Sequence, residues 1–373
     1  MQYKEFQDKH LSALGFGSMR LPLIDGKNDA IDEKATAEMV AYAMEKGINY
    51  YDTAWGYHDG NSELVMGRIL SQYPRDRFYL ASKFPGYDHN NWPKVREIFE
   101  KQLEKCGVEY FDFYMFHNVC EMNIDAYLDP QYGIYDELIR RKESGHIHHL
   151  GFSAHGNYDT MKRFLEAYGK DMEFCQLQIN YLDWNFQKAK EKVELLNAYD
   201  IPLWVMEPLR GGKLAKLPDT AMEQLKAFRS EETAVGWAFR FLQSVPEAAV
   251  TLSGMSDMEQ LKANIAIYEE DKPATAAERE ALFRIAAEVL NGVPCTSCRY
   301  CTEYCQQELD IPILIDLYNE HKFTNGGFMA PFALQAMDKS KHPDACVACG
   351  RCEEVCPQEI KISEVLADFA KML

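Results

Sequence analysis

Short apolar runs recur about every thirty residues along the first 254 positions of the chain. Most of them are apolar on both faces, which is typical of strands buried in a parallel sheet. There are eight such runs, at residues 13–17, 48–52, 78–84, 110–116, 148–153, 174–179, 201–206 and 248–254. The segments between them carry apolar residues at steps of three and four, as in 33–47, 62–73 and 94–107, and this spacing predicts amphipathic helices.

Eight strands that alternate with helices predict an α/β protein whose parallel sheet closes into a (β/α)8 TIM barrel. An open, doubly wound sheet is the competing fold. The first strand of such a sheet usually leads into a glycine-rich GxGxxG turn, and "LGFGSMRLP" at residues 14–22 lacks this turn. The sequence therefore favours the barrel.

Two more helices are predicted over residues 256–271 and 275–290, and "NGVP" at 291–294 then breaks the helical pattern. We expect a barrel domain at residues 1–291 and a cysteine-rich, mainly helical domain at residues 292–373. The length of 373 residues fits this division, because a TIM barrel alone commonly takes about 250 residues.

The charge balance narrows the range of partners. The chain has 40 basic and 58 acidic residues, a formal net charge of −18, which repels nucleic acids and anionic membranes. We therefore expect neither as a partner. The first residues are charged where a signal peptide needs an apolar run, and no stretch of about 18 apolar residues occurs. We expect a cytoplasmic protein.

Eight of the 11 cysteines lie in two runs, "CTSCRYCTEYC" at 295–305 and "CVACGRCEEVCP" at 346–357. Bacterial-type ferredoxins hold two [4Fe–4S] clusters with this CxxCxxCxxxC spacing, and the fourth cysteine of each run binds the other cluster. The first expected ligand set is Cys295, Cys298, Cys301 and Cys356. The second is Cys346, Cys349, Cys352 and Cys305.

Two structural zinc sites are the alternative, because four thiolates also satisfy tetrahedral zinc. Zinc sites usually pair two CxxC motifs across a longer gap, so two consecutive runs of three plus one favour iron and sulfur. A reducing cytoplasm disfavours disulfides. The forty residues between the runs exceed what a minimal ferredoxin needs, which predicts helices between them.

Four polar residues fall at or just after the ends of three consecutive predicted strands: Asp52, Tyr57, Lys83 and His117. Each has an ordinary structural explanation alone, but catalytic side chains of TIM barrels come from this rim. A lysine ammonium beside a tyrosine is expected to lower the pKa of the phenol, and an aspartate holds the lysine charged. Such a phenol can protonate a carbonyl oxygen while a hydride reaches the carbon, and a histidine can orient the carbonyl.

On these residues the chain resembles the aldo-keto reductases, in particular members with a C-terminal ferredoxin-like extension that holds two [4Fe–4S] clusters. The resemblance covers nearly the whole chain. Its marks are "LGFGSMRLP" (14–22), "DTAWGY" (52–57), "SKF" (82–84), "FHN" (116–118), "GFSAHG" (151–156), "QINY" (178–181) and "EPLRGG" (207–212). The resemblance implies a catalytic tetrad of Asp52, Tyr57, Lys83 and His117, with Tyr57 as the general acid that protonates the carbonyl oxygen while an aldehyde or ketone is reduced by hydride transfer.

The resemblance also implies a nicotinamide cofactor, NADPH or NADH, bound across the rim. By position, Ser153 and Gln178 hold its carboxamide. The loop over the pyrophosphate contains Leu209, Gly211 and Gly212.

Several positions depart from the family pattern. Ala154 replaces an asparagine, and the neighbouring His155 is the expected substitute. Met206 replaces a tyrosine that stacks on the nicotinamide, so the ring would rest on a thioether. Gln260 stands where the family has a cation for the 2′-phosphate, with Lys262 the only nearby cation, so NADH is at least as plausible as NADPH. Asn264 matches an adenine-side asparagine.

Three hypotheses for the role of the clusters remain open. The protein is a carbonyl reductase whose clusters mainly fold the C-terminal domain, or the clusters carry electrons between a redox partner protein and a bound flavin or substrate. In the third hypothesis the chain is a redox sensor or an electron-transfer subunit whose barrel does not turn over a substrate. The intact tetrad argues against this hypothesis. A flavin normally bridges two-electron and one-electron steps, and the sequence carries no flavin-binding signature.

Overall fold

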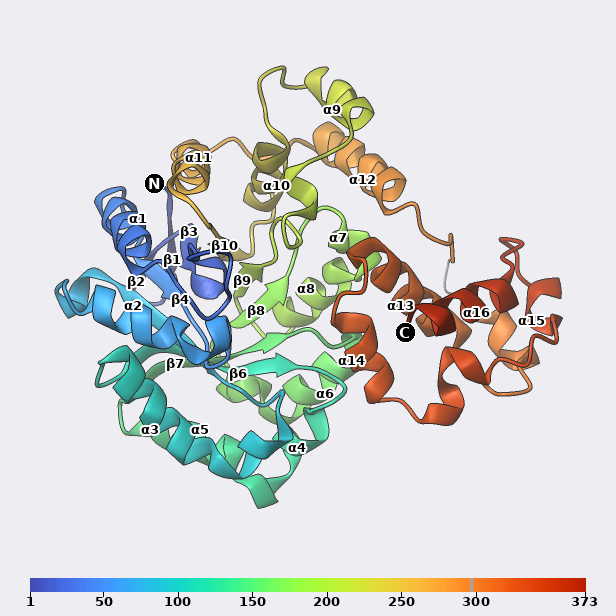
Figure 1. Cartoon of the computed structure of the whole chain (residues 1–373), viewed down its shortest axis with the longest axis horizontal. Helices are drawn as coiled ribbons and strands as arrows, with labels where there is room; N and C mark the ends of the chain where they lie inside the picture. The colour runs from blue at the N-terminus through green and yellow to red at the C-terminus, as the bar shows by residue number, and fades with distance from the viewer. Residues whose placement is uncertain (296–297) are drawn as a thin grey trace. The chain divides into compact units, whose positions relative to one another are not determined.

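The computed structural model describes residues 1–295 and 298–373 (Figure 1). These residues form two compact units, Met1–Phe283 and Arg284–Leu373, and each is described by itself. The helix α12 (Ala276–Leu290) contributes residues to both units. The domain division after residue 291 that the sequence suggests stays a prediction.

The first unit is a closed barrel of eight parallel strands, in the order β10-β3-β4-β5-β6-β7-β8-β9. The strands are β3 (Leu14–Gly17), β4 (Tyr50–Asp52), β5 (Tyr79–Phe84), β6 (Phe111–Val119), β7 (Ile147–Ala154), β8 (Cys175–Gln178), β9 (Leu203–Met206) and β10 (Ala248–Gly254). Each lies within or overlaps one of the eight apolar runs. The TIM barrel predicted from the sequence is therefore confirmed.

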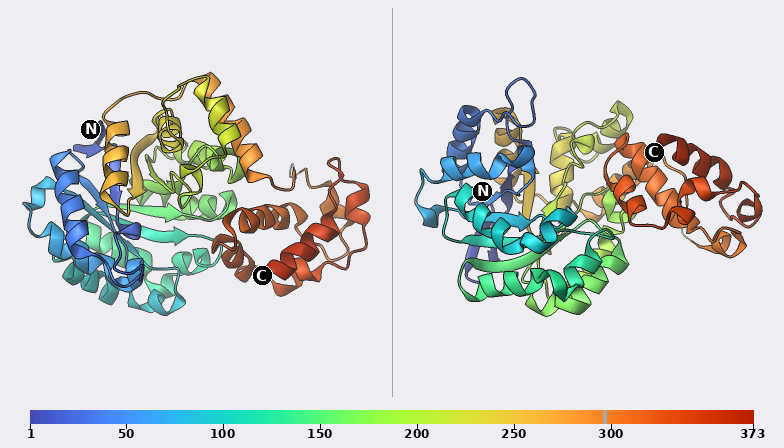
Figure 2. Two further views of the ribbon diagram at one scale, coloured as in Figure 1. Left: turned by 45° about the horizontal axis from the view of Figure 1, so that its top comes forward. Right: turned by 60° about the horizontal axis from the view of Figure 1, so that its bottom comes forward.

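Helices surround the strands on the outside of the barrel, as two further views show (Figure 2). The longer ones are α1 (Glu33–Glu45), α2 (Ser62–Leu70), α3 (Val95–Cys106), α5 (Ile134–Glu143), α6 (Tyr158–Tyr168), α8 (Ala189–Asn197), α10 (Ala234–Gln243) and α11 (Met258–Tyr268). Shorter ones are α4 (Ile124–Leu128), α7 (Asp183–Phe186) and α9 (Asp219–Lys226). Side-chain caps fix several starts: the Asp32 carboxylate accepts the Ala35 amide proton at α1.

A short antiparallel hairpin precedes the barrel and is absent from the sequence prediction. It consists of β1 (Tyr3–Phe6) and β2 (Lys9–Ser12). Phe6 is buried in the core cluster that contains Trp204 and Phe113, with its ring centroid 5.0 Å from that of Trp204. The hairpin thus extends the aromatic core of the barrel.

The second unit is helical, with α13 (Ile311–Thr324), α14 (Met329–Gln335), α15 (Arg351–Glu354) and α16 (Ile362–Met372). Its core packs α13 against α16, where the Tyr318 and Phe369 ring centroids lie 5.9 Å apart and the Tyr318 hydroxyl donates to Asp368 at 2.8 Å. Because α13 and α14 lie between the two cysteine runs, the predicted intervening helices are confirmed. Within residues 1–295 and 298–373, no helix has both the length and the apolar character needed to cross a membrane.

Candidate functional site

Three neighbouring strands of the barrel carry the four residues that the sequence singled out. Asp52 ends β4, Lys83 lies near the end of β5, and His117 lies near the end of β6. Tyr57 begins the short helix η2 (Tyr57–Gly60) in the loop after β4. Strands β4, β5 and β6 are adjacent in the barrel, so these side chains share one end of its interior.

The ammonium group of Lys83 connects this site. It donates to Asp52 Oδ1 at 2.5 Å, to the Thr53 carbonyl oxygen at 2.9 Å and to the Tyr57 hydroxyl at 3.4 Å. An ammonium has three donors, and all three are used. Lys83 is 0% and Asp52 4% exposed, whereas Tyr57 is half-buried. Of the three side chains, Tyr57 is therefore the one that a ligand can reach.

His117 lies beside this group without a direct bond to it. Its ring centroid is 6.2 Å from that of Tyr57, with the rings nearly perpendicular. Its Nδ1 atom is buried and has no hydrogen-bond partner among the residues that the structure describes. Burial holds the pKa of His117 well below its usual range, and repulsion from Lys83 and His155 acts in the same direction. The imidazole is therefore neutral at physiological pH.

The titration of Tyr57 differs from the sequence-based expectation. Desolvation raises the pKa of Tyr57 above its ordinary value, and the nearby Lys83 offsets this effect only in part. The expected lowering of the phenol pKa is therefore wrong. Burial disfavours the ammonium of Lys83, but Asp52 and Tyr57 outweigh it and raise the pKa of Lys83. At neutral pH the site holds a protonated phenol beside a charged lysine.

Gln176 on β8 belongs to the site and was missed by sequence reasoning. Its side-chain amide donates to Asp52 Oδ2 at 3.2 Å, so both carboxylate oxygens of Asp52 have partners. Two glutamines in one short apolar strand are the signal that could have found it. The sequence gives no means of deciding which of Gln176 and Gln178 faces Asp52, because residues two apart point to the same face of a strand.

Gln178 is held by a different group of buried residues. Its side-chain nitrogen donates to Asp183 Oδ2 at 2.8 Å, and the side-chain nitrogen of Asn180 donates to the same oxygen at 2.6 Å. The Arg210 Nε atom donates to both oxygens of Asp183, at 2.9 and 3.0 Å. Met206 pairs with Gln178 in the β8–β9 register. This network joins the loops that follow two adjacent strands.

The loop after β9 turns sharply at the glycines that the resemblance assigns to the pyrophosphate. Gly211 has φ 62° and Gly212 has φ 90°, in the left-handed region that glycine tolerates best. The Gly212 amide donates to the Leu209 carbonyl oxygen at 3.0 Å. Both glycines are exposed, and Leu209 is half-buried.

Ser153 and His155 lie at the end of β7 and just after it. The Ser153 hydroxyl oxygen accepts the backbone N–H of Asn118 at 2.8 Å. The proton of the hydroxyl group is therefore still able to donate. Burial lowers the pKa of His155 to about 4, with a further contribution from Lys192. A neutral imidazole therefore stands where the resemblance places the substitute for asparagine.

The residues expected on the adenine side lie on or near α11. The Gln260 side chain folds back on the N-cap Asp257, donating to Oδ2 at 2.8 Å, and the buried Asn264 donates to the Ser253 hydroxyl at 3.1 Å. Among the described residues, no hydrogen bond joins Gln260 or Asn264 to the tetrad.

Lys262 was expected to be the only cation near this end of the barrel, and that expectation is wrong. The ammonium of Lys262 lies over the Tyr42 ring, 5.4 Å from its centroid. Arg20 also lies at this end of the barrel, next to Gly254. If Gly254 carried a Cβ atom, that atom would lie 3.2 Å from Arg20 Cβ. Arg20 lies 234 positions before Gly254 in the chain, so their proximity could not be predicted from the sequence.

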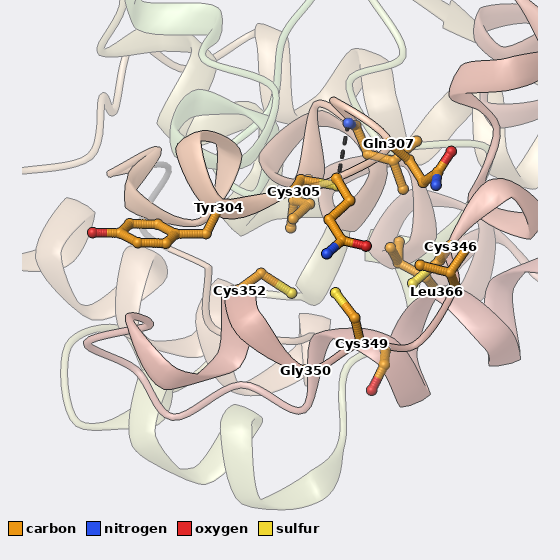
Figure 3. A pocket seen from close by; sticks show the side chains of 13 residues that line it. Tyr304, Cys305, Gln307, Cys346, Cys349, Gly350, Cys352 and Leu366 are labelled. Atoms are coloured by element: carbon orange, nitrogen blue, oxygen red, sulfur yellow. Dashed lines mark hydrogen bonds between the residues drawn. The ribbon is translucent and has the colours of Figure 1, made fainter.

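The eight clustered cysteines line two separate hollows in the second unit. One hollow, of about 350 Å³ including space open to solvent, has Cys305, Cys346, Cys349 and Cys352 in its lining (Figure 3). The other, of about 320 Å³, has Cys295, Cys298, Cys301 and Cys356. The fourth cysteine of each run thus lies with the other run, as the spacing predicts.

The two hollows resemble each other in exposure. Cys298 and Cys349 are exposed, whereas Cys301 and Cys352 are buried. The Leu309 amide donates to Cys305 Sγ at 3.4 Å, the kind of backbone contact that supports a bound thiolate. Within residues 1–295 and 298–373, no three histidine, cysteine or acidic side chains are grouped so as to hold a single metal ion.

Fold and site together define a class: a parallel α/β barrel with a tyrosine–lysine–aspartate group at its rim, linked to a helical unit with two cysteine-lined hollows. A family model described as "Aldo/keto reductase family" matches residues 13–279, and the chain belongs to this family. A second model, described as "4Fe-4S dicluster domain", matches residues 294–360.

Curated relatives agree with this assignment. A protein named probable aldo-keto reductase 1, from Glycine max, is 29% identical over 215 residues, 55% of this chain and 58% of that protein. The NADH-specific methylglyoxal reductase of Escherichia coli is 25% identical over 224 residues, 56% of this chain and 66% of that protein. The matches thus span 58% and 66% of the length of these two relatives.

Solved structures share the fold. The holo form of the aldo-keto reductase AKR11C1 from Bacillus halodurans has a TM-score of 0.62 at 23% identity, covering 76% of this chain and 96% of that one. An aldo/keto reductase from Klebsiella pneumoniae, solved with NADP and acetate, has a TM-score of 0.58 at 17% identity, covering 75% and 93%. At these identities the likeness concerns the fold alone.

Proposed function

We propose that the barrel is a NAD(P)H-dependent carbonyl reductase in which Tyr57 is the general acid. The observation that carries this proposal is the position of the Lys83 ammonium, which contacts both the Tyr57 hydroxyl and the Asp52 carboxylate. A reduced nicotinamide, when bound, supplies a hydride to the carbonyl carbon. Tyr57 gives its proton to the carbonyl oxygen, and Lys83 stabilises the phenolate that remains.

The other two residues prepare this step. Asp52 keeps Lys83 charged and in place, because an ammonium enclosed without a counter-ion would lose its proton. His117 remains neutral, so its ring can orient the substrate carbonyl through a hydrogen bond without adding a second positive charge. The substrate class is an aldehyde or ketone small enough to reach the half-buried phenol.

The residues around the tetrad fit a nicotinamide. The Oδ1 atom of Asn118 and the Nδ1 atom of His117 are buried polar atoms without partners among the described residues, and Ser153 has a hydroxyl proton to donate. A carboxamide offers both donors and an acceptor to such atoms. The proposed cofactor contacts are Ser153, His155, Gln178, Met206, Leu209, Gly211, Gly212, Gln260 and Asn264.

NADH is the proposed cofactor rather than NADPH. Asp257 caps α11 with its carboxylate, which accepts the backbone N–H of Gln260 at 2.8 Å. A helix N-terminus attracts a phosphate, but a carboxylate already bonded there repels a dianion. The Escherichia coli relative that is named NADH-specific supports this choice.

We further propose that the second unit holds two [4Fe–4S] clusters in a cytoplasmic, reducing environment. Cysteine thiols are the ligands that such clusters need, and four line each hollow. The first set would be Cys295, Cys298, Cys301 and Cys356, and the second Cys305, Cys346, Cys349 and Cys352.

An electron-transfer role for these clusters is a second candidate function. Each hollow has one exposed cysteine, Cys298 or Cys349, through which a redox partner protein could exchange electrons with a cluster.

The proposal is tested by purifying the whole chain anaerobically and measuring iron, acid-labile sulfide and zinc. NADH and NADPH oxidation against aldehydes, ketones and quinones then tests the barrel. About two zinc ions per chain without sulfide would contradict the iron–sulfur proposal, and no nicotinamide oxidation with any carbonyl compound would contradict the carbonyl-reductase proposal.

A further inference from the structure

The loop that carries Tyr57 has an unfavourable backbone. The three residues that follow Tyr57 all have positive φ: 53° at His58, 54° at Asp59 and 91° at Gly60. Glycine adopts this region most readily; asparagine, aspartate and histidine adopt it more often than other residues, but as single residues rather than in succession. Consecutive residues in this conformation persist only where surrounding contacts hold them.

The His58 side chain supplies such contacts. It is 4% exposed, and its ring bonds to two backbone groups of one segment of the chain. The Leu21 amide donates to His58 Nε2 at 3.1 Å, and Nδ1 lies 2.9 Å from the Asn28 carbonyl oxygen. An amide can only donate and a carbonyl oxygen can only accept, so Nε2 is the acceptor and Nδ1 the donor in these two contacts.

The same segment, residues 18–32 between β3 and α1, is tied to both ends of the tyrosine loop. The Ser18 hydroxyl donates to the Asp52 carbonyl oxygen at 2.5 Å, and the Ser62 hydroxyl donates to the Ser18 carbonyl oxygen at 3.0 Å. The Asn61 side chain donates to the Asp29 carbonyl oxygen at 2.9 Å. His58 is the contact nearest to Tyr57 along the chain.

We propose that His58 is a positioning residue that holds the Tyr57 hydroxyl at Lys83 by clamping the tyrosine loop onto residues 18–32. The proposal deepens the proposed function, because it rests on Tyr57 as the general acid. His58 does not act on the substrate. It fixes the backbone from which the acid projects, in a loop whose own preference is different.

Three substitutions separate the two halves of the clamp. His58→Ala removes both bonds. His58→Asn keeps a donor near the position of Nδ1 and suits a left-handed backbone, while His58→Gln keeps an acceptor near the position of Nε2. We expect kcat for carbonyl reduction to fall about 100-fold in His58→Ala, because a misplacement of about 1 Å costs this much. We expect His58→Asn to recover part of that loss, and the dissociation constant of NADH to stay within about two-fold.

Hydrogen exchange gives a readout that does not depend on activity. In His58→Ala the peptides that contain Leu21 should exchange faster than in the parent protein, because the Leu21 amide loses its acceptor. The exposed His89, which bonds none of these segments, provides the control His89→Ala, with parental kcat and exchange expected.

Unchanged kcat together with unchanged exchange at residues 18–32 in His58→Ala would overturn the proposal. Loss of NADH affinity in proportion to kcat would also overturn it, since that pattern indicates general unfolding of the barrel. If His58→Ala does not fold, His58→Asn and His58→Gln carry the same comparison. Full activity of Tyr57→Phe would instead refute the proposed function, and the exchange measurement would still decide whether the clamp exists.

Discussion

The ammonium nitrogen of Lys83 lies 3.4 Å from the hydroxyl oxygen of Tyr57. The lysine arrives from β5 and the tyrosine from the loop after β4, so two adjacent strands of the barrel create the contact. The lysine is fully enclosed and the tyrosine is half-buried. The buried positive charge of Lys83 therefore lies beside the hydroxyl proton of the more accessible Tyr57. A proton donor needs this arrangement.

Tyr57→Phe should abolish most carbonyl reduction while leaving the cofactor site intact. The change removes the acid proton and keeps the ring, so we expect kcat to fall by about 100-fold to 10,000-fold. NADH binding, measured by fluorescence titration, should be unchanged. Tyr87→Phe is the matched control, because the Tyr87 ring also lies beside His117, with centroids 5.3 Å apart, but has no bond to Lys83. Equal losses in both variants would contradict the assignment of the acid.

Lys83→Met should destabilise the barrel as well as inactivate it. The change leaves Asp52 buried without its counter-ion, which costs about 3 to 5 kcal/mol in comparable pairs. The double variant Asp52→Asn with Lys83→Met should recover part of this loss. All 5 tryptophans lie before residue 284, so tryptophan fluorescence during denaturation reports on the barrel.

A surface ion pair provides the control for this measurement. Arg68 and Glu33 form an exposed pair at 2.7 Å, and Arg68→Met should cost at most about 1 kcal/mol. A Lys83→Met barrel as stable as the Arg68→Met barrel would show that the Lys83–Asp52 pair is not enclosed as described.

The pH dependence of reduction follows from two perturbed groups. Tyr57 must be protonated to act, and its pKa is raised, so activity should persist below that pKa and be lost only as the pH rises above about 10. The pKa of His117 is well below 6.5, so the neutral ring should persist on the acid side. We expect kcat for aldehyde reduction to be flat from about pH 6 to pH 10. A titration near pH 6.5 would contradict the neutral histidine, and the residual rate of Tyr57→Phe should lack the alkaline fall.

The barrel could be predicted from the sequence because each of its strands is buried on both faces and separated from the next by a helical pattern. The hairpin β1–β2 could not, because its strands have 4 residues each and mostly polar side chains, without an apolar run. The grouping of the cysteines around two hollows could be predicted for a different reason, because in the CxxCxxCxxxC spacing of bacterial-type ferredoxins the fourth cysteine of each run lies with the other run.

The errors concern quantities that depend on surroundings. Whether a lysine lowers the pKa of a tyrosine depends on how far the hydroxyl is desolvated, and the sequence does not show desolvation. Arg20 beside Gly254 and Gln176 beside Asp52 are contacts between distant segments. The alternation of polar and apolar residues indicates which face a side chain occupies, but it does not identify the partner across the barrel.

Asp257→Ser should narrow the preference for NADH over NADPH. Serine keeps the N-cap of α11 and removes the negative charge, so we expect the dissociation constant of NADPH to fall about five-fold and that of NADH to stay constant. Asp32→Ser makes the same change at the N-cap of α1 and should alter neither constant. An Asp257→Ser protein with unchanged NADPH affinity would show that the 2′-phosphate does not approach this helix.

The pairing of the cysteine runs predicts which substitutions have the same effect. Cys356→Ser should reproduce the spectroscopic change of Cys295→Ser, because both residues line one hollow, although they are 61 positions apart in the chain. Cys305→Ser should in the same way reproduce Cys346→Ser, whose thiol lines the other hollow. Each variant should lose about half of the iron and the electron paramagnetic resonance signal of one reduced cluster. The buried barrel residue Cys120 supplies the control, and Cys120→Ser should retain full iron. If Cys305→Ser instead matched Cys295→Ser, the clusters would be held within single runs, and the lining of the two hollows would not be their ligand sets.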